Sequence, residues 1–503
     1  MKKKALLAAA LLAAVSLAPA QSESPVPDIT LDEAVQLALK QNPAILTAEQ
    51  EIKRTRGVVL QVTAQALPQV TLANNFTQVD KELLTGGGAG SSSSSASGGE
   101  STSGSNGGTT MGSSSGAASA AAAAEASPMT QSWDVTITAS QLIYSGGQVG
   151  AAIHIARYTQ DATIYALRDI VDTTIANVRS QFYAVLLDRV IIKVQEDNIN
   201  LLGSQLKDQQ NRFEAGTVPR FNVLQAEVAL ANAQPQLIQA RDDYNVAGLN
   251  LARTLGINTT DIGKTTAPIN AVGVLTTDER PEDLGEAMQL ARERRPFLKE
   301  QREQILIQVE NIKVALAGYQ PKLYADGGYE VRNNELSKSL DNTVQGWFFG
   351  FTGSWDIFDG GATYGEVKQA KAQLEEAKVS YDDAARQVDV EVQQAYDEVQ
   401  ESEETISSQE QTVVQAQEAL RLAQEQLAAG AGTQLNVLSA QVALTQARTT
   451  VAQAQYNYNI AMAQFDRVTA ANTHWQDSFH DPLVDRQREQ EGIVSARPSS
   501  AKP

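Results

Sequence analysis

The chain has no cysteine among its 503 residues and only three histidines. Disulfide bonds, thiolate metal sites and cysteine nucleophiles are therefore excluded, as is the acylated cysteine of a lipoprotein. The formal net charge of −19 provides no excess of Lys and Arg for phosphate contacts, so we expect no nucleic acid partner. Aromatic residues make up only 6% of the chain. The apolar residues recur at helical spacing, which indicates long helices rather than compact domains.

Long hydrophobic runs are also missing, apart from one at the start of the chain. Lys2, Lys3 and Lys4 precede the run ALLAAALLAAVSLA, and Ala-Pro-Ala at 18–20 suits a signal peptidase. We therefore expect residues 1–20 to be a signal peptide. The alternative is a membrane anchor, which a run this short disfavours. Any membrane insertion of the remaining chain must then use something other than an apolar helix.

An internal duplication organises the chain. AGTVPRFNVLQAEVAL at 215–230 returns as AGAGTQLNVLSAQVAL at 429–444, an offset of 214 residues, and IYSGG at 143–147 returns as IFDGG at 357–361. Before residue 80 the offset is 253, which pairs LDEAVQLALKQNP at 31–43 with LGEAMQLARERRP at 284–296. The two offsets differ by 39 residues, the size of an insertion in the first copy.

A tract of Gly, Ser and Ala within residues 85–128 accounts for that insertion. It has almost nothing to bury, so we expect a flexible loop. The expected layout begins with the signal peptide at 1–20 and a first repeat at 21–255, which has strands at about 68–80 and 132–144 and a helical hairpin at 147–255. A linker at 256–283 leads to a second repeat at 284–471, which has strands at about 321–332 and 346–358 and a helical hairpin at 362–470. A polar, disordered tail is expected at 472–503.

The second strand of each copy alternates in hydrophobicity. Trp133, Val135 and Ile137 in the first copy correspond to Trp347, Phe349 and Phe351 in the second, and a period of two places each set on one face of a sheet. We predict that these six side chains face lipid in a transmembrane β-barrel, with a soluble half-buried sheet as the alternative. Four strands cannot close a barrel, so several chains must each contribute strands to it.

The helices after these strands carry a heptad pattern. Between Val388 and Leu427, ten of the twelve positions spaced four and three apart are apolar, and the helix of roughly 65 residues would be about 100 Å long. We expect glycines at 216 and 430 to end the long helices, and Asn222 or Asn436 to cap the helices that return along them. An isolated pair of this kind would be an ordinary antiparallel coiled coil.

The order of these features resembles the TolC family of outer-membrane efflux channels. The resemblance rests on the signal peptide, the two-copy layout, Asn42-Pro43, the strand ends LIYSGGQ and DIFDGGA, and the paired NVLQAE and NVLSAQ turns, and it covers about residues 28–470. It implies an α+β membrane protein: a homotrimer with a 12-stranded β-barrel in the outer membrane and a 12-helix α-barrel in the periplasm. It also implies a periplasmic adaptor protein and an inner-membrane RND or ABC transporter as partners, in an efflux pump or a type I secretion system.

The resemblance also gives the repeated turns a role as the periplasmic gate and adaptor-binding tips. The candidate residues are Gly216, Thr217, Val218, Pro219, Asn222, Gly430, Gly432, Thr433, Asn436 and Ser439. A well-studied member of the family carries cation-binding Asp residues at this constriction, where this chain has Asn222, Asn436 and Ser439. We therefore expect weaker cation preference, while helix capping is the simpler explanation of both asparagines.

Two other functional classes fit the sequence less well. An enzyme is disfavoured because His154, His474 and His480 are scattered and no catalytic, metal-binding or phosphate-binding pattern is present, so we expect no cofactor. A coiled-coil protein that spans the periplasm without transporting anything would explain the heptads but not the alternating strands. The sequence leaves the cargo open.

Overall fold

The computed structural model describes residues 28–78, 131–257, 269–277, 283–333 and 343–471. The expected signal peptide at 1–20, the Gly/Ser tract at 85–128 and the tail at 472–503 lie outside these ranges. The chain divides into two compact units. We call residues 1–57, 157–308 and 372–503 the helical unit, and residues 58–156 and 309–371 the sheet unit.

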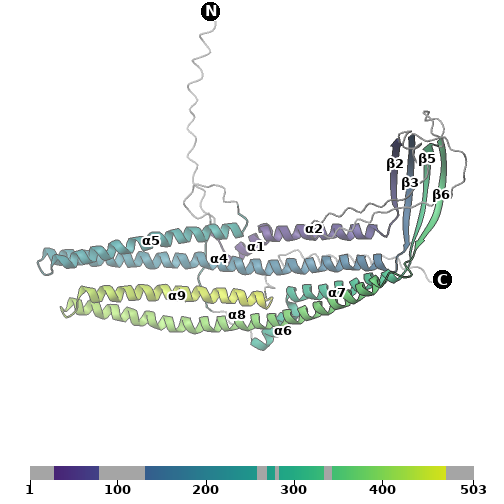
Figure 1. The fold of residues 1–503 in the computed structure, drawn as a ribbon. Coiled ribbons are helices and arrows are strands. Elements are labelled where there is room, and N and C mark those ends of the chain that lie inside the picture. Colours follow the sequence, from purple (N-terminus) through teal and green to yellow (C-terminus); the bar gives the residue numbers. More distant parts are fainter. Residues whose placement is uncertain (1–27, 79–130, 258–268, 278–282, 334–342, 472–503) are drawn as a thin grey trace, which may run out of the picture. The chain divides into compact units, whose positions relative to one another are not determined.

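The helical unit is built around two antiparallel helix pairs, and the longer helix of each pair has its first turns in the sheet unit (Figure 1). In the first repeat α4 (Gln148–Glu214) pairs with α5 (Arg220–Thr254), and in the second α8 (Ala362–Ala428) pairs with α9 (Gln434–Val468). The shorter helices are α1 (Leu31–Gln41), α2 (Pro43–Ala64), α6 (Leu284–Arg294) and α7 (Pro296–Leu316). Within the described ranges, none of these helices combines the length and hydrophobicity that crossing a bilayer would need.

The heptad pattern of α8 marks its packed side, as the sequence predicts. All twelve positions of the pattern from Val388 to Leu427 are buried or half-buried. Val392 and Val399 are fully buried in a cluster with Phe465 of α9. The corresponding pattern of α4 is less regular, since Val178 and Val185 are fully buried but Phe213 is exposed. The two long helices are therefore similar without being equivalent, and α5 continues unbroken through Pro235.

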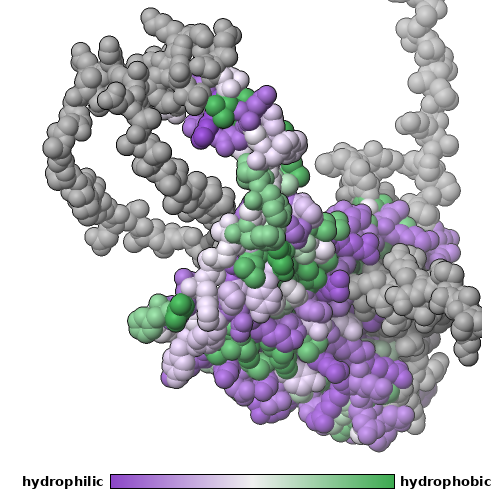
Figure 2. All heavy atoms as spheres, turned by 90° about the vertical axis from the view of Figure 1, so that its right-hand side faces the viewer, coloured by the Kyte–Doolittle hydropathy of each residue, from purple (hydrophilic) through white to green (hydrophobic). Residues whose placement is uncertain are grey.

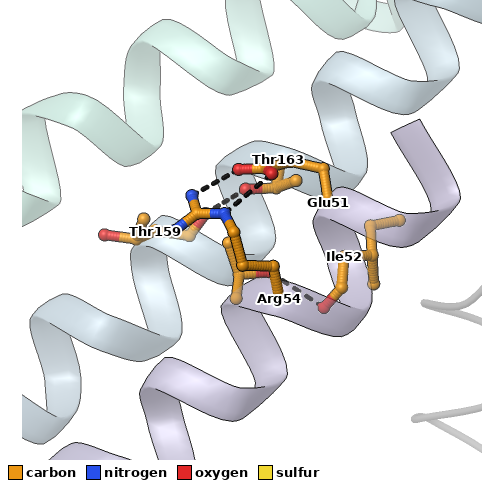
Figure 3. A network of polar contacts seen from close by, with 6 residues as sticks. Glu51, Ile52, Arg54, Thr159 and Thr163 are labelled. Carbon is orange, nitrogen blue, oxygen red and sulfur yellow. Dashed lines mark hydrogen bonds and ion pairs between the residues drawn. The ribbon is translucent and has the colours of Figure 1, made fainter. Parts of the chain in front are cut away.

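The first repeat has its core where α1, α2, α4 and α5 meet. Phe182 of α4 lies there with Ile52 of α2 and Leu251 of α5, all almost completely buried. Figure 3 shows the polar side chains around Ile52, where Arg54 of α2 pairs with Glu51 next to Thr163 of α4. Thr163 donates its hydroxyl to its own helix, so the polar groups at the contact find local partners.

Asn42 joins two elements of this core. Its Oδ1 accepts a hydrogen bond from the N–H of Ala44 at 2.8 Å, which caps α2, and its Nδ2 donates to the carbonyl of Thr254 at 2.7 Å. Gly256, at φ +74°, follows α5, and a Cβ there would stand 2.3 Å from the Gln41 carbonyl oxygen. The Asn-Pro pair therefore holds the α1–α2 corner against the end of α5.

A two-residue parallel pairing was not predicted from the sequence. Strand β1 (Asp28–Ile29) pairs with β4 (Asn270–Ala271), which lies in the segment expected to be a linker. The side chain of Asn270 donates to Asp28 and accepts from Arg189 of α4. The segment around β4 is therefore fixed to the helical unit by both strand pairing and side-chain hydrogen bonds.

The sheet unit contains one antiparallel sheet in the order β2-β3-β5-β6 (Figure 1). Its strands are β2 (Gln69–Gln78), β3 (Gln131–Tyr144), β5 (Lys322–Asn333) and β6 (Thr343–Ser354). The strand predicted at 346–358 is corrected at both ends. The ladder with β5 begins at Thr343 and stops at Ser354, because Lys322, the partner of Ser354, is the first residue of β5.

The junction from β6 to α8 is a glycine turn. Trp355 leaves the sheet and donates its indole N–H to the carbonyl of Tyr319 at 3.1 Å. Gly360 and Gly361 have φ of +70° and +94°, values that side chains disfavour. The carboxylate of Asp359 accepts hydrogen bonds from the N–H groups of Gly361 and Thr363 at 2.8 and 2.7 Å. A hydrogen bond from the Thr363 side chain, followed by these two backbone bonds, lowers the pKa of Asp359 to about 2, and together they fix the start of α8.

Candidate functional site

The four-stranded sheet has two chemically different faces. Residues paired across strands point to the same side, while successive residues of one strand alternate. The register pairs Phe76 with Trp133, Ile137 with Tyr329 and Tyr329 with Trp347, so one face is continuous over all four strands. We call this the apolar face. It carries Val70, Leu72, Phe76, Trp133, Val135, Ile137, Ala139, Leu323, Ala325, Tyr329, Val331, Trp347, Phe349 and Phe351.

All six strand residues selected from the sequence lie on the apolar face. Trp347, Phe349 and Phe351 of β6 are 84%, 73% and 69% exposed, and Ile137 of β3 is also exposed. Trp133 and Val135 are half-buried in the described chain. The six residues therefore share one face, as the period of two predicts, and the three on β6 are more accessible than the three on β3.

Aromatic contacts reinforce this face without covering it. Tyr329 and Trp347 meet edge to face with ring centroids 4.8 Å apart, and Phe349 and Phe351 do so at 5.1 Å. Each such pair contributes about 0.5–1.5 kcal/mol beyond area burial. Figure 2 shows hydrophobic residues gathered along the strands. An exposed apolar surface of this extent is typical of a site that contacts lipid or protein.

Sequence reasoning missed half of the apolar face. It named residues only on the second strand of each repeat, while β2 contributes Val70, Leu72 and Phe76 and β5 contributes Tyr329 and Val331. The sequence signal for β2 was the alternation of Val70, Leu72 and Phe76 in QVTLANNF. This signal is weak because Asn74, the register partner of Val135, interrupts the hydrophobic series.

The opposite side, which we call the polar face, carries hydroxyl and charged groups. Its polar residues include Thr71, Asn75, Thr77, Asp134, Thr136, Thr138, Ser140, Lys322, Asp326, Glu330, Arg332 and Thr352, and it also carries Ala73, Leu142, Val344, Tyr324 and Phe348. Thr352 donates its hydroxyl to Asp326 at 3.1 Å, and Arg332 lies 3.7 Å from Glu330. One face of the sheet is therefore suited to water and the other to hydrocarbon.

The two repeated turns have nearly the same backbone geometry. In the first, Gly216 has φ +74°, its N–H donates to the carbonyl of Phe213, and the N–H of Thr217 donates to that of Arg212. In the second, Gly430 also has φ +74°, and the N–H groups of Gly430 and Ala431 make the corresponding bonds. A left-handed glycine that satisfies the last carbonyls is a common helix ending. Both glycines therefore end their helices, as predicted.

The predicted asparagine caps are wrong. Helix α5 begins after Pro219 and α9 after Thr433, so Asn222 and Asn436 are each the third residue of their helix. The hydroxyl of Thr433 accepts from the N–H of Asn436 at 3.3 Å, while Pro219 makes no side-chain cap. The turns are shorter than the sequence suggested, because each helix resumes within a few residues of its glycine.

Most of the ten predicted tip residues are accessible. Gly216, Thr217, Pro219, Gly430, Thr433, Asn436 and Ser439 are exposed, whereas Val218, Asn222 and Gly432 are half-buried. A Cβ on Gly432 would stand 3.0 Å from the Leu427 nitrogen, so this position is packed against its own turn. The side chain of Asn436 plays no part in the cap and is available for other contacts.

A buried polar seam joins the two hairpins near these turns. Gln209 of α4 donates its amide to Oε1 of Gln434 of α9 at 3.1 Å, and Gln441 donates to Oδ1 of Asn198 at 2.8 Å. Gln209, Gln434 and Gln441 are almost fully buried. The seam was missed from the sequence, where the seven-residue spacing of Gln434 and Gln441 was its only signal.

No group of three His, Asp or Glu side chains suited to a metal ion occurs in the described ranges.

Known protein families and solved structures share this architecture. The family model described as outer membrane efflux protein matches residues 34–257 and 287–471. The solved structure of the Campylobacter jejuni CmeC outer membrane channel superposes with a TM-score of 0.70 and 16% identity, over 91% of this chain and 88% of CmeC. No curated protein shows a significant sequence match.

Two further channel structures are similar. The Vibrio cholerae outer membrane protein VceC gives a TM-score of 0.66 at 16% identity, over 87% of this chain and 95% of VceC. The Neisseria gonorrhoeae MtrE outer membrane channel, solved in an open state, gives 0.66 at 16% identity, over 87% and 88%. The family match and the shared fold confirm the resemblance seen in the sequence, and the chain belongs to the outer membrane efflux protein family of TolC-type channels.

Proposed function

We propose that the chain is the outer-membrane channel of a tripartite efflux pump or a type I secretion system. Three copies form a 12-stranded β-barrel in the outer membrane and a 12-helix α-barrel in the periplasm. Substrates pass through the shared interior from an inner-membrane RND or ABC transporter and its periplasmic adaptor to the exterior. The protein is then a conduit rather than an enzyme.

The two-faced sheet is the observation that supports this proposal most strongly. An exposed apolar face that includes Trp347, Phe349 and Phe351 matches a lipid-facing surface, and the polar face matches a water-filled interior. Among the described residues, β2 and β6 each pair on one side only. Open strand edges are not tolerated in lipid, so strands from other copies are needed to complete the wall.

The accessible turns support a role for the helix tips. Three copies would present six turns, with Asn436 and Ser439 exposed on the second turn of each chain. We propose that the ten tip residues form the gate and the adaptor-binding surface. Their uncharged chemistry favours weaker cation preference than a ring of carboxylates would give.

Engineered disulfides test the trimeric barrel, because the natural chain has no cysteine. Asn74→Cys on β2 is combined in turn with cysteine at Thr343, Gln345 or Trp347 on β6. Within one copy β2 and β6 are separated by two strands, or about 14 Å, which exceeds the reach of a disulfide. Oxidised outer membranes should therefore yield covalent dimers and trimers for at least one pair. Pairs of Asn74→Cys with cysteine at Gly346 or Phe348, which point to the other face, should not crosslink. Absence of intermolecular crosslinks from every pair would contradict the proposal.

A further inference from the structure

Phe348 is one of two aromatic side chains, with Tyr324, that lie on the polar face of the sheet. Phe348 stands between Trp347 and Phe349 in β6, so it points to the polar face. Its register partner is Gly328 of β5, and a Cβ on Gly328 would stand 2.7 Å from the Phe348 Cζ atom. The ring therefore lies over Gly328, which has no side chain to displace it, and Phe348 remains 40% exposed.

Acidic groups lie on both sides of this ring. Asp326 and Glu330 are two residues before and after Gly328 on β5 and point to the same polar face. Their partners on β6 are Gly350 and Gly346, where an added Cβ would meet nothing within 4 Å. The two glycines that flank Phe348 on this face of β6 therefore leave open space beside the ring and opposite both carboxylates.

The neighbouring charges leave Asp326 as the stronger negative group. Thr352 donates a neutral hydroxyl to Asp326 at 3.1 Å, which orients the carboxylate without cancelling its charge. Glu330 has Arg332 at 3.7 Å, and Arg332 is the register partner of Asp134 on β3. Lys322 lies on the same face four residues before Asp326, nearer the end of the strand.

This arrangement favours one class of ligand. Asp326 and Glu330 are four residues apart, about 13 Å along a strand, so they cannot both ligate one metal ion. An aromatic face attracts an organic cation and also contacts its apolar part. We propose that Phe348, Asp326 and Glu330 form a binding patch for organic cations with a hydrophobic body, on the side of the sheet that faces the channel interior.

This inference depends on the proposed function, because it requires the polar face to line a channel. Three copies would place three such patches at one level of the wall. These patches would bind cationic substrates transiently during passage. They would thereby influence which substrates pass, whereas the helix tips would control whether the channel is open.

Block of channel current in planar bilayers tests the patch. The probes are benzyltrimethylammonium, tetramethylammonium, which keeps the charge but lacks the ring, and benzenesulfonate, which keeps the ring but is an anion. We expect benzyltrimethylammonium to block at the lowest concentration and benzenesulfonate not to block. Phe348→Leu should raise the half-blocking concentration of benzyltrimethylammonium roughly threefold or more. The matched variant Phe349→Leu, on the apolar face, should leave it unchanged.

Asp326→Asn provides a second variant that keeps the ring and the hydrogen bond from Thr352. It should also weaken block by benzyltrimethylammonium, with little change in unblocked conductance. A conducting channel that all three probes block equally, or whose block neither Phe348→Leu nor Asp326→Asn alters, would overturn the patch and leave the proposed channel intact. An assembled protein without conductance would overturn both.

Discussion

The backbone N–H of Asn436 donates a hydrogen bond to Oγ1 of Thr433 at 3.3 Å, so Thr433 caps α9 and the Asn436 side chain remains exposed. If Asn436 faces the pore, Asn436→Asp should increase cation selectivity and strengthen block by trivalent cations. The change keeps the cap, and a carboxylate near a helix N-terminus is favourable. Reversal potentials in a salt gradient measure the effect.

The matched control for that measurement is Asn457→Asp. Asn457 is also exposed on α9, but it lies 21 residues further along the helix and accepts a hydrogen bond from Gln453 that an Asp can also accept. It should leave selectivity unchanged. Equal selectivity of wild type and Asn436→Asp would refute a pore-facing position for Asn436.

Loss of the Thr433 cap should loosen the start of α9. Replacing a capping Thr by Ala costs about 1 kcal/mol, which corresponds to about fivefold faster local opening. Amide hydrogen exchange in residues 434–438 should therefore accelerate in Thr433→Ala. Thr450→Ala removes only a hydroxyl bonded within the middle of α9 and should have no such effect. Unaltered exchange in Thr433→Ala would show that the cap contributes nothing.

A charge should be tolerated on one face of the sheet and not on the other. Phe349→Lys places a cation on the apolar face, which costs about 2–4 kcal/mol at the middle of a bilayer. Thr352→Lys, three residues along β6, places it on the polar face. We expect Phe349→Lys to reduce the heat-modifiable form in the outer-membrane fraction, while Thr352→Lys assembles normally. The opposite result, or equal loss in both, would contradict the assignment of the faces.

Asp188 on α4 should make stability depend on pH. Burial, and secondarily the carboxylate of Asp243, raise its pKa to about 6, whereas an unfolded Asp titrates near 4. The folded chain therefore binds a proton more readily, so stability increases as pH falls through about 6 and the gain is complete below about 4. At pH 7.5 the charged group costs about 1 kcal/mol after allowance for its partial exposure.

Asp188→Asn removes that cost. It should unfold at a higher temperature than wild type at pH 7.5, and the difference should shrink at pH 5. Asp242→Asn, at an exposed position of α5, should change neither. An advantage of Asp188→Asn that is the same at both pH values would show that titration of Asp188 is not its cause.

The buried contact between Gln209 and Gln434 should show coupling. Replacing one residue by Leu leaves the other amide buried without its partner, at a cost of about 1–3 kcal/mol. The double Leu variant removes both amides and should recover most of the loss. A double-mutant cycle by thermal unfolding measures this, and strictly additive losses would contradict the contact.

The parts of the structure that follow hydrophobic spacing could be predicted from the sequence. Val392 and Val399 lie in the core of α8 because a seven-residue repeat sets which side of a helix is apolar. Trp347, Phe349 and Phe351 share one face because a strand alternates with period two. The glycine turns at Gly216 and Gly430 could also be predicted from the sequence, since a left-handed residue that ends a helix is most often glycine.

The features that were missed depend on short or polar elements. Strands β1 and β4 have two residues each, too few to show alternation. The Asn436 cap was wrong because Asn suits an N-cap, yet Thr433 precedes it and occupies that position. The Gln209–Gln434 contact depends on side-chain geometry that spacing does not contain. Phe348 was overlooked because one strand holds consecutive aromatics that face opposite sides.

The central claim is that copies of this chain form a conducting channel across a bilayer. The most direct measurement is conductance of the purified full-length protein in planar bilayers, with subunit stoichiometry determined on the same sample by native mass spectrometry. The account predicts trimers that produce discrete conductance steps, and loss of those steps in the assembly-defective variant Phe349→Lys. Folded, membrane-inserted protein that is trimeric and yet never conducts, or that conducts as a monomer, would contradict it.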